Sequence, residues 1–363
     1  MKESMRRAVL ILLGSLLGYA ALEGLIFHNL YASIIRPDSS AGNVETFIDN
    51  ELRRARTDAN QVLGIGDSRL QGALTPRVAN QLRSETGYTF ANISTAGSTP
   101  RCWYYMLRDV DPAANRYSAI VISVDSYDDA ETWEDFADRQ TDLHYMIARL
   151  RLSDLFEFSG SYHDPQRKWE AFRGILVKGL VYKQDFQHFL LRPALRLAYV
   201  KQSRRESVHW FYDYVGSAED MQGVEVDFAA HTLKIPPDRL AQKPGYEEAF
   251  LNPLPPYTGR RGAYLRYWLG KIQARYRGSG TRLVFLRFPR GPVVRPDQPP
   301  VIAHSSVRDL AAYPEVTLLP EHFFDSLERP ELFLDQLHLN RTGSDQFSAM
   351  LAREMRELLG PPR

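Results

Sequence analysis

A serine, an aspartate and a histidine in this sequence have the types and the surroundings of a nucleophilic hydroxyl and its base. Ser68 follows the apolar run "VLGIG", and Asp335 and His338 lie three residues apart in "FLDQLHLNRTG". A serine becomes a nucleophile when an imidazole takes its proton and a carboxylate orients that imidazole. The sequence therefore predicts acyl transfer through Ser68, with His338 as the base and Asp335 as the partner of the base.

The elements around these residues predict an α/β fold with a mostly parallel, five-stranded sheet. Short apolar runs alternate with amphipathic stretches, as in a sheet that has helices on both faces. Because ligands bind at the carboxyl ends of parallel strands, a serine directly after a strand lies at the expected edge. Thr75 and Thr342 are the expected N-caps of two helices, and Gly87 follows the first of them. Strands are predicted at 61–66, 88–94, 117–124, 281–289 and 315–320, and helices at 75–87, 99–110, 262–278 and 342–360.

This alternation stops between Asp125 and Gly259. The stretch is rich in aromatic and charged residues, and helices are expected near 131–150, 165–180 and 184–203. It predicts a large, mainly helical insertion at about 126–257 within a domain that covers 61–363. Such an insertion could be a lid, a polysaccharide-binding face or a docking surface for a partner.

The first residues predict a single membrane anchor. Basic residues precede an apolar stretch at 8–27, and about 20 helical residues at roughly 1.5 Å each span a hydrocarbon core of roughly 30 Å. Glu23 opposes insertion, but it lies near the end of the stretch, where its carboxylate can reach the interface. A cleaved signal peptide is the alternative, although no convincing cleavage site follows the stretch.

The charge around this anchor predicts its direction in the membrane. Because the positive charges come first, residues 1–7 are expected to stay in the cytoplasm. Residues 28–60 would then connect the anchor to a domain outside, on the periplasmic side of an inner membrane. The anchor itself is the expected contact with the membrane.

Composition excludes several classes of function. The chain has 363 residues, a formal net charge of +1 at pH 7 and one cysteine, Cys102. A nearly neutral chain with no strong basic block is not expected to bind nucleic acid. A single cysteine excludes an intrachain disulfide framework and a cysteine-based zinc site. No metal and no cofactor is expected.

Donors at the same edge of the sheet could stabilise a developing oxyanion. The first candidates are the backbone N–H groups of Ser68 and of Gly97, which lies in "NISTAGSTP" after the second strand. A glycine lets the backbone approach a substrate oxygen closely. The alternative for Gly97 is an ordinary turn.

These segments resemble the SGNH/GDSL hydrolase superfamily. "GDS" at 66–68, Gly97 and "DxxH" at 335–338 are similar, in order, to its blocks I, II and V. The "GDSR" form, the ending "FLDQLHLNRTGSDQFS" and the anchor resemble the membrane-bound branch. That branch accompanies O-acylation of bacterial cell-surface polysaccharides, as in alginate O-acetylation and teichoic-acid D-alanylation. The resemblance implies a flavodoxin-like three-layer fold, an acyl-serine intermediate at Ser68 and no metal, and it leaves the insertion out.

One position departs from the pattern of that superfamily. Its third block has the form GxND, and the asparagine donates to the oxyanion, whereas "VISVDSYDD" has Asp125 nearest that place. A carboxylate there would repel an oxyanion, and losing one such donor costs roughly 10²–10³ in rate. Asp125 could point away as a structural cap, Ser126 or Asn92 could replace the donor, or the site could be weak or inert as a hydrolase.

Two arginines could contact a substrate. Arg69 follows the serine and could bind an anionic substrate or hold a carboxylate such as Asp67. Arg101 begins a helix with aromatic side chains that could line a sugar site but more often belong to a core: Trp103, Tyr104 and Tyr105.

Two functions from different classes follow. The first is an extracytoplasmic, membrane-anchored serine O-acyltransferase or acyl esterase that acts on cell-envelope polysaccharide, with an acylated glycan or an acyl donor as its ligand. The anchor and the family branch favour the transferase, and a multi-spanning membrane acyltransferase or a polysaccharide synthase could be its partner. The second is a weak or inert glycan-binding or scaffold subunit of a polysaccharide modification or export complex.

Overall fold

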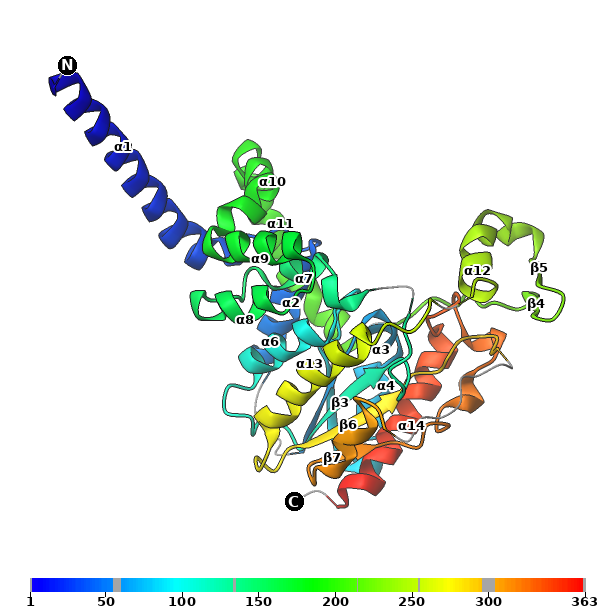
Figure 1. Cartoon of the computed structure of the whole chain (residues 1–363). Helices are drawn as coiled ribbons and strands as arrows, with labels where there is room; N and C mark the ends of the chain where they lie inside the picture. Colours follow the sequence, from blue (N-terminus) through cyan, green and yellow to red (C-terminus); the bar gives the residue numbers. More distant parts are fainter. Residues whose placement is uncertain are drawn as a thin grey trace. The chain divides into compact units, whose positions relative to one another are not determined.

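The structure is a computed structural model that describes residues 2–54, 60–132, 135–213, 215–253, 255–295 and 304–361. It divides into two compact units (Figure 1). The smaller unit contains Met1–Thr46 and Ala137–Glu206, and the larger unit contains Phe47–Phe136 and Ser207–Arg363.

The larger unit contains a five-stranded sheet in which every pair of neighbouring strands is parallel. The predicted α/β class and the parallel sheet are confirmed. The sheet order is β2-β1-β3-β6-β7, so the chain reverses its direction across the sheet between β1 and β3, where doubly wound folds bind ligands. The strands are β1 Gln61–Ile65, β2 Thr89–Asn92, β3 Ala119–Val124, β6 Arg282–Arg287 and β7 Val316–Leu318.

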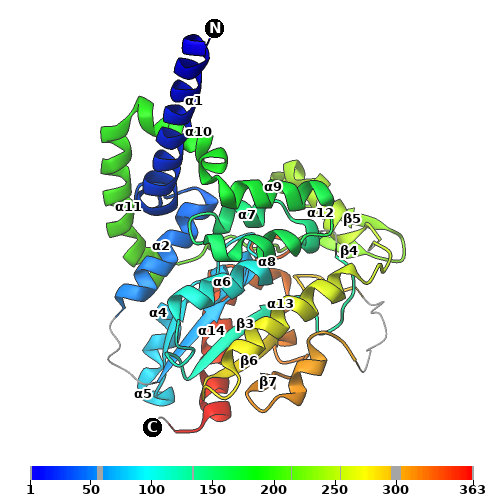
Figure 2. The same cartoon turned by 60° about the vertical axis from the view of Figure 1, so that its left-hand side comes forward.

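Helices cover both faces of this sheet, as Figures 1 and 2 show. Strands β1 and β3 are buried along their whole length, which agrees with the near-continuous apolar runs of the sequence. One face carries α6 Pro100–Val110 and α13 Arg260–Tyr276. The other carries α3 Ser68–Ala73, α4 Pro76–Gln81, α5 Arg83–Thr86 and α14 Arg341–Leu359.

The helix predicted at 75–87 is divided in two at Leu82. The side chain of Asn80 accepts a hydrogen bond from the backbone N–H of Phe90 in β2 and donates one to the carbonyl of the same residue. This contact attaches the end of α4 to the sheet. Gly87 does end the second piece, and its φ of 77° lies in the left-handed region that glycine adopts without strain.

The last helix begins at Arg341, and its N-cap is Asn340 and not Thr342, so the predicted cap is wrong. The Asn340 side chain accepts a hydrogen bond from the backbone N–H of Gly343. Its amide also donates to the carbonyl of Glu331. This second bond links the start of α14 to the preceding loop.

The stretch expected as an insertion, 126–257, is helical through its first part. The expected helix at 131–150 is short in the structure, and Trp133 and Glu134 lie outside the described residues. A helix break at Arg192 separates two long helices, because Pro193 cannot continue the hydrogen bonding of the first. The helices are α7 Thr141–Met146, α8 Leu155–Gly160, α9 Pro165–Leu176, α10 Lys178–Leu191, α11 Pro193–Asp213 and α12 Lys243–Phe250. An antiparallel pair, β4 Glu225–Asp227 and β5 Thr232–Lys234, lies between α11 and α12 in the chain.

The N-terminal segment is helical and apolar. It comprises α1 Lys2–Leu22 and a π-helical continuation, η1 Glu23–Leu30. The helix Met5–Ser33 is long and apolar enough to cross a membrane, and its side chains are exposed up to residue 22. The expected connector, 28–60, contains the helix α2 Ser40–Arg53, and residues 55–59 lie outside the described part of the chain.

Short 3₁₀ turns complete the described chain. They are η2 Tyr31–Ser33, η3 Phe136–Asp138, η4 Leu152–Asp154, η5 Pro237–Gln242, η6 Arg308–Ala312, η7 Asp325–Leu327 and η8 Pro330–Leu332.

Candidate active site

Ser68, His338 and Asp335 meet at the carboxyl end of β1, although 270 residues separate the serine from the histidine. The Nε2 atom of His338 lies 2.8 Å from Oγ of Ser68. The Nδ1 atom of the same ring lies 2.8 Å from Oδ2 of Asp335. If Nδ1–H donates to the carboxylate, Nε2 is left unprotonated and can accept the hydroxyl proton.

The turn between β1 and α3 leaves no room for a side chain at residue 66. A Cβ atom on Gly66 would lie 2.4 Å from Oγ of Ser123 in the neighbouring strand. Asp67 then caps α3, since its side chain accepts a hydrogen bond from the backbone N–H of Arg69. Glycine thus lets β1 approach β3 closely just before Ser68 begins the helix.

Asn92, at the end of β2, holds α3 in place. Its amide nitrogen donates to the carbonyls of Leu70 (2.9 Å) and Leu74 (2.8 Å). Its oxygen accepts from the backbone N–H of Ser94. The amide N–H groups of Asn92 are therefore used in bonds to the segment that begins at Ser68. The alternative in which Asn92 donates to an oxyanion is wrong.

The Asp335 turn orients the histidine. The carboxylate accepts hydrogen bonds from the backbone N–H groups of Leu337 and His338, both at 2.8 Å. Burial favours the neutral carboxyl group, but the hydrogen bonds and the interaction with the His338 ring outweigh it, so the pKa of Asp335 lies below its ordinary value. A bridge between Phe333 and Leu339 closes the loop on either side of this pair.

The loop that contains Gly97 is bonded to the turn before Ser68. Gly97 has a φ of 73°, and its loop is attached to residue 66, because Thr95 N–H and Ser98 Oγ both donate to the Gly66 carbonyl at 3.0 Å. The N–H groups of Gly97 and Ser68 donate to no other residue in the described part of the chain. Both N–H groups therefore keep an unused hydrogen-bond donor within the described part of the chain.

Asp125 follows β3 and is engaged by two guanidinium groups. It forms ion pairs with Arg69 and with Arg261, the latter at 2.7 Å. Arg261 is buried, and burial together with the positive charge of Arg69 lowers the pKa of its guanidinium to about 10. The charge of Asp125 is therefore compensated at the position where the resemblance to the SGNH pattern predicts an asparagine.

Arg69 and Ser126 also have partners within the protein. Arg69 pairs with Asp67 at 2.8 Å in addition to Asp125. Burial favours the neutral form of Asp67, but Arg69 outweighs it, so the pKa of the Asp67 carboxyl lies below its usual value. Ser126 Oγ accepts a hydrogen bond from the backbone N–H of Asp128. The sequence leaves two roles open for Arg69, binding an anionic substrate or holding a carboxylate. The structure shows the second, since Arg69 holds Asp67 and Asp125.

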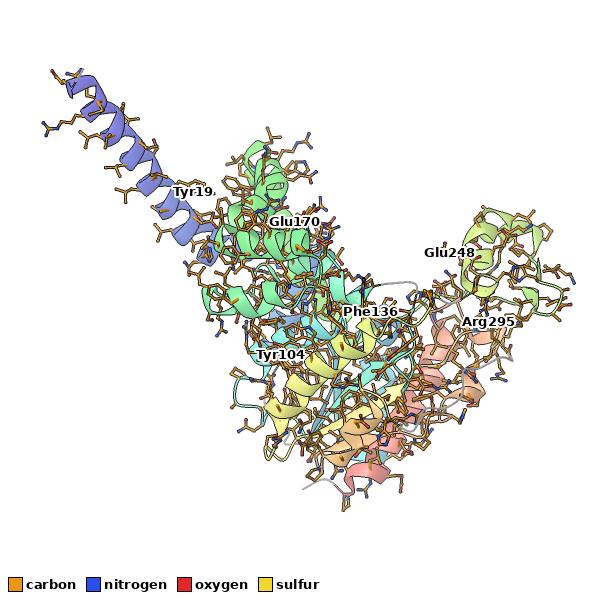
Figure 3. The ribbon with its side chains drawn as sticks, in the orientation of Figure 1. Tyr19, Tyr104, Phe136, Glu170, Glu248 and Arg295 are labelled. Atoms are coloured by element: carbon orange, nitrogen blue, oxygen red, sulfur yellow. The ribbon has the colours of Figure 1, made fainter. Side chains whose placement is uncertain are left out.

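Arg101 does not line a surface site. Its side chain is fully buried, and its guanidinium lies over the rings of Tyr264 (5.2 Å) and Trp268 (5.9 Å). Trp103 and Tyr105 are also buried, while Tyr104 lies on α6 beside α13 (Figure 3). The expectation of a sugar site at Arg101 is wrong, and the aromatic residues belong to the packing of α6 on α13.

Arg261 is the site residue that the sequence reading missed. It lies 136 residues after Asp125, in a helix whose pattern predicts only packing. Nothing in the local sequence marks it, because its role depends on the contact between α13 and the loop after β3.

The described residues contain no group of three or more histidine, cysteine, aspartate or glutamate side chains that could hold a metal ion. No protein-family model matches the chain, and neither does any curated protein. The chemistry must therefore be inferred from the side chains gathered around Ser68.

Proposed function

We propose that the protein is a membrane-anchored serine acyl esterase or O-acyltransferase of the SGNH type that acts on acyl esters of cell-envelope polysaccharide. The observation that carries the proposal is the hydrogen-bonded series Ser68–His338–Asp335 at the carboxyl end of β1. Its support from the fold is the sheet order β2-β1-β3-β6-β7, which is the flavodoxin-like order 2-1-3-4-5 with its switch point beside β1.

In the first half-reaction the hydroxyl oxygen of Ser68 forms a bond to the acyl carbonyl carbon. Its proton passes to Nε2 of His338, and the negative charge of Asp335 stabilises the imidazolium that results. The carbonyl oxygen becomes an oxyanion, for which the N–H groups of Ser68 and Gly97 are the donors. The intermediate then breaks its bond to the alcohol oxygen, which leaves with the proton from His338.

In the second half-reaction an acceptor hydroxyl attacks the acyl-serine. His338 removes the proton of the acceptor and returns it to Oγ of Ser68 as the acyl–serine bond breaks. Water as the acceptor gives an esterase, and a sugar hydroxyl gives an O-acyltransferase. No metal or cofactor takes part in either half.

The N-terminal helix supports the cellular setting of the proposal. Arg6 and Arg7 precede the apolar part of the helix Met5–Ser33, and positive charge on one flank favours retention of that end in the cytoplasm. The domain with Ser68 would then act on the periplasmic side of an inner membrane. This position suits a transferase that receives acyl groups from a multi-spanning membrane acyltransferase or works beside a polysaccharide synthase.

Asp125 supports a second function. If the Asp125–Arg69 pair leaves the oxyanion with too few donors, the domain would bind glycan without turnover, as a scaffold subunit of a modification or export complex. The two functions differ in one property, since only the enzyme forms a covalent bond to Ser68.

The experiment compares hydrolysis of an activated acetyl ester by the wild type and three variants. Ser68→Ala and His338→Ala are expected to lower kcat by roughly 10³ or more. Ser279→Ala is the matched control, because its hydroxyl bonds only to the backbone of its own turn, at the Tyr276 carbonyl and the Thr281 N–H. Equal turnover by the wild type and Ser68→Ala would refute the nucleophile, and binding of an acetylated oligosaccharide without turnover would favour the scaffold.

A further inference from the structure

The turn between α10 and α11 exposes a cluster of leucines. Leu190, Leu191 and Leu195 are 60 %, 79 % and 64 % exposed, and Arg192 and Pro193 form the turn itself. We call residues 190–195 the hairpin tip. Clustered large apolar side chains on a surface mark a site of contact with another apolar phase.

The helix that leads to this tip packs against the end of the candidate membrane helix. Phe27 and Tyr31 belong to the helix Met5–Ser33. Their rings contact two aromatic side chains of α10, with centroids 5.0 Å apart for Phe27–Phe186 and 4.7 Å apart for Tyr31–Tyr182. Figure 2 shows α10 beside the end of α1. When this helix crosses a bilayer, α10 therefore packs against the last turns of the crossing helix.

Polar contacts fix the hairpin in this position. The Glu23 carboxylate accepts hydrogen bonds from the backbone N–H of Gly179 at the start of α10. The Tyr31 hydroxyl donates to Asp185 at 2.6 Å, and Arg196 of α11 holds the same carboxylate with two hydrogen bonds of 2.9 Å. The tip is thus attached to the membrane helix through contacts on both α10 and α11.

Two cations without an ion-pair partner lie in the hairpin tip and on the helix that leads to it. Lys183 and Arg192 are exposed and form no ion pair with any other residue that the structure describes. Leucines with basic side chains beside them match a membrane interface, where apolar groups enter the acyl boundary and cations meet lipid phosphates. A purely apolar protein partner would leave these two charges without a counter-charge.

We propose that the hairpin tip inserts into the headgroup region of the leaflet at which α1 ends, as a second membrane contact of the smaller unit. Lys183 and Arg192 then lie against the phosphates of anionic lipids. Two contacts on one packed unit prevent that unit from rotating freely about α1. The inference rests on α1 spanning the membrane and does not depend on the chemistry at Ser68.

The test uses the full chain reconstituted in vesicles of phosphatidylethanolamine and phosphatidylglycerol. Cys102 is the single cysteine of the chain and is buried, so Cys102→Ala gives a background for one added cysteine. A polarity-sensitive fluorophore is attached at Leu191→Cys, and the matched control is Gln202→Cys on the same helix. Gln202 lies roughly 14 Å along α11 from the turn at about 1.5 Å per residue, beyond the roughly 5–10 Å depth of interfacial insertion.

The fluorophore at position 191 is expected to shift its emission to shorter wavelength and to be quenched by lipids that carry a shallow nitroxide. The fluorophore at position 202 should instead be quenched by iodide in the buffer. Iodide quenching at 191 would overturn the proposal, and so would shielding at 191 without lipid quenching, because the tip would then contact a second copy of the chain. Flotation of the protein with the vesicles reports the insertion of α1 separately.

A charge reversal tests the role of the two cations. The double variant Lys183→Glu/Arg192→Glu should lose most of the lipid quenching at position 191 in vesicles with phosphatidylglycerol. In vesicles of phosphatidylcholine alone the variant and its parent should differ little. Unchanged quenching in the anionic vesicles would overturn the assignment of Lys183 and Arg192 to lipid phosphates.

Discussion

Arg69 and Asp125 form an ion pair between the residues that follow β1 and β3. Each also has a second partner of opposite charge, Asp67 for the arginine and Arg261 for the aspartate. The series Asp67–Arg69–Asp125–Arg261 alternates in charge and sums to zero. It lies beside Ser68, and the carboxylate of Asp125 is therefore not a lone negative charge next to that residue.

Replacing Asp125 tests this view of the series. Asp125→Asn introduces the asparagine of the SGNH pattern that the sequence resembles, but leaves Arg69 and Arg261 with one negative partner fewer. We expect the free energy of unfolding to fall by about 1–3 kcal/mol, the range for hydrogen bonds to charged groups, and kcat not to rise. Urea denaturation and ester hydrolysis measure the two effects.

The control for this substitution is Asp345→Asn. Asp345 pairs with Arg77 at a more exposed site, where such pairs contribute about 0.2–1 kcal/mol. A clear increase in kcat for Asp125→Asn would show that the aspartate suppresses the reaction and would contradict compensation by the arginines.

Two asparagines bond to the backbone near β2, but only Asn92 holds α3, the helix that begins at Ser68. Replacing each of them distinguishes a role in positioning Ser68 from a role in packing alone. Asn92→Ala removes the donor to the Leu70 and Leu74 carbonyls of α3. The free energy of unfolding should fall by about 1–3 kcal/mol, because the Leu74 carbonyl loses its bond to Asn92 and the Leu70 carbonyl keeps only its bond from the Leu74 N–H. The value of kcat should fall by a larger factor than KM changes. Asn80→Ala also removes two bonds to the backbone, those to Phe90, but should leave kcat unchanged. Equal kcat values for the two variants would mean that Asn92 does not position Ser68.

Two glycines test the close approach of β1 to β3. In Gly66→Ala the new methyl group would meet Ser123 Oγ at 2.4 Å and Leu70 Cβ at 3.0 Å. The turn must shift, and we expect kcat to fall at least tenfold. In Gly72→Ala nothing lies within 4 Å of the new atom, and alanine favours the helix by about 1 kcal/mol. A fully active Gly66→Ala enzyme would show that the position of Ser68 does not depend on this contact.

Asp335→Asn keeps the shape of the side chain and removes its charge. An amide can hold the wrong tautomer of His338, and kcat is expected to fall by roughly 10³–10⁴. Ester hydrolysis at neutral pH measures this loss. A variant with more than a tenth of the wild-type rate would show that the charge of Asp335 is dispensable.

The same substitution gives a pH dependence of stability. The pKa of Asp335 is lower in the folded protein than its reference value of 3.8. The ionised carboxylate therefore stabilises the fold fully above that reference value, and this contribution disappears as the pH falls through the lower folded-state pKa. Urea denaturation of the wild type and Asp335→Asn should give a constant difference near neutral pH and a smaller one in acid. A difference that grows in acid would contradict the lowered pKa.

The sequence predicts those parts of the site whose residues lie close together in the chain. The apolar run ending at Ile65 and the turn at Gly66 place a strand before Ser68. Asp335 and His338 share one turn, so their spacing alone predicts that they interact. The parallel pairing follows from the same alternation of short apolar runs and helices, whereas the order of the strands in the sheet does not follow from it.

Contacts between segments that are far apart in the chain leave no recognisable pattern in the sequence. The sequence offers Asn92 as one alternative donor to an oxyanion, but its amide bonds to carbonyls at both ends of the segment Leu70–Leu74, which follows Ser68. Arg261 reaches Asp125 only because α13 packs beside the loop after β3. Asn340 and Thr342 are both good capping residues, and the additional bond from Asn340 to Glu331 distinguishes them.

Covalent modification of Ser68 tests the central claim most directly. The wild type is incubated with a fluorophosphonate, digested with trypsin and analysed by mass spectrometry. We predict an adduct on the peptide that ends at Arg69, its absence in Ser68→Ala, and formation slowed by roughly 10³ or more in His338→Ala. An unmodified wild type, or an adduct that persists on the same peptide in Ser68→Ala, would contradict the assignment of Ser68 as an activated nucleophile.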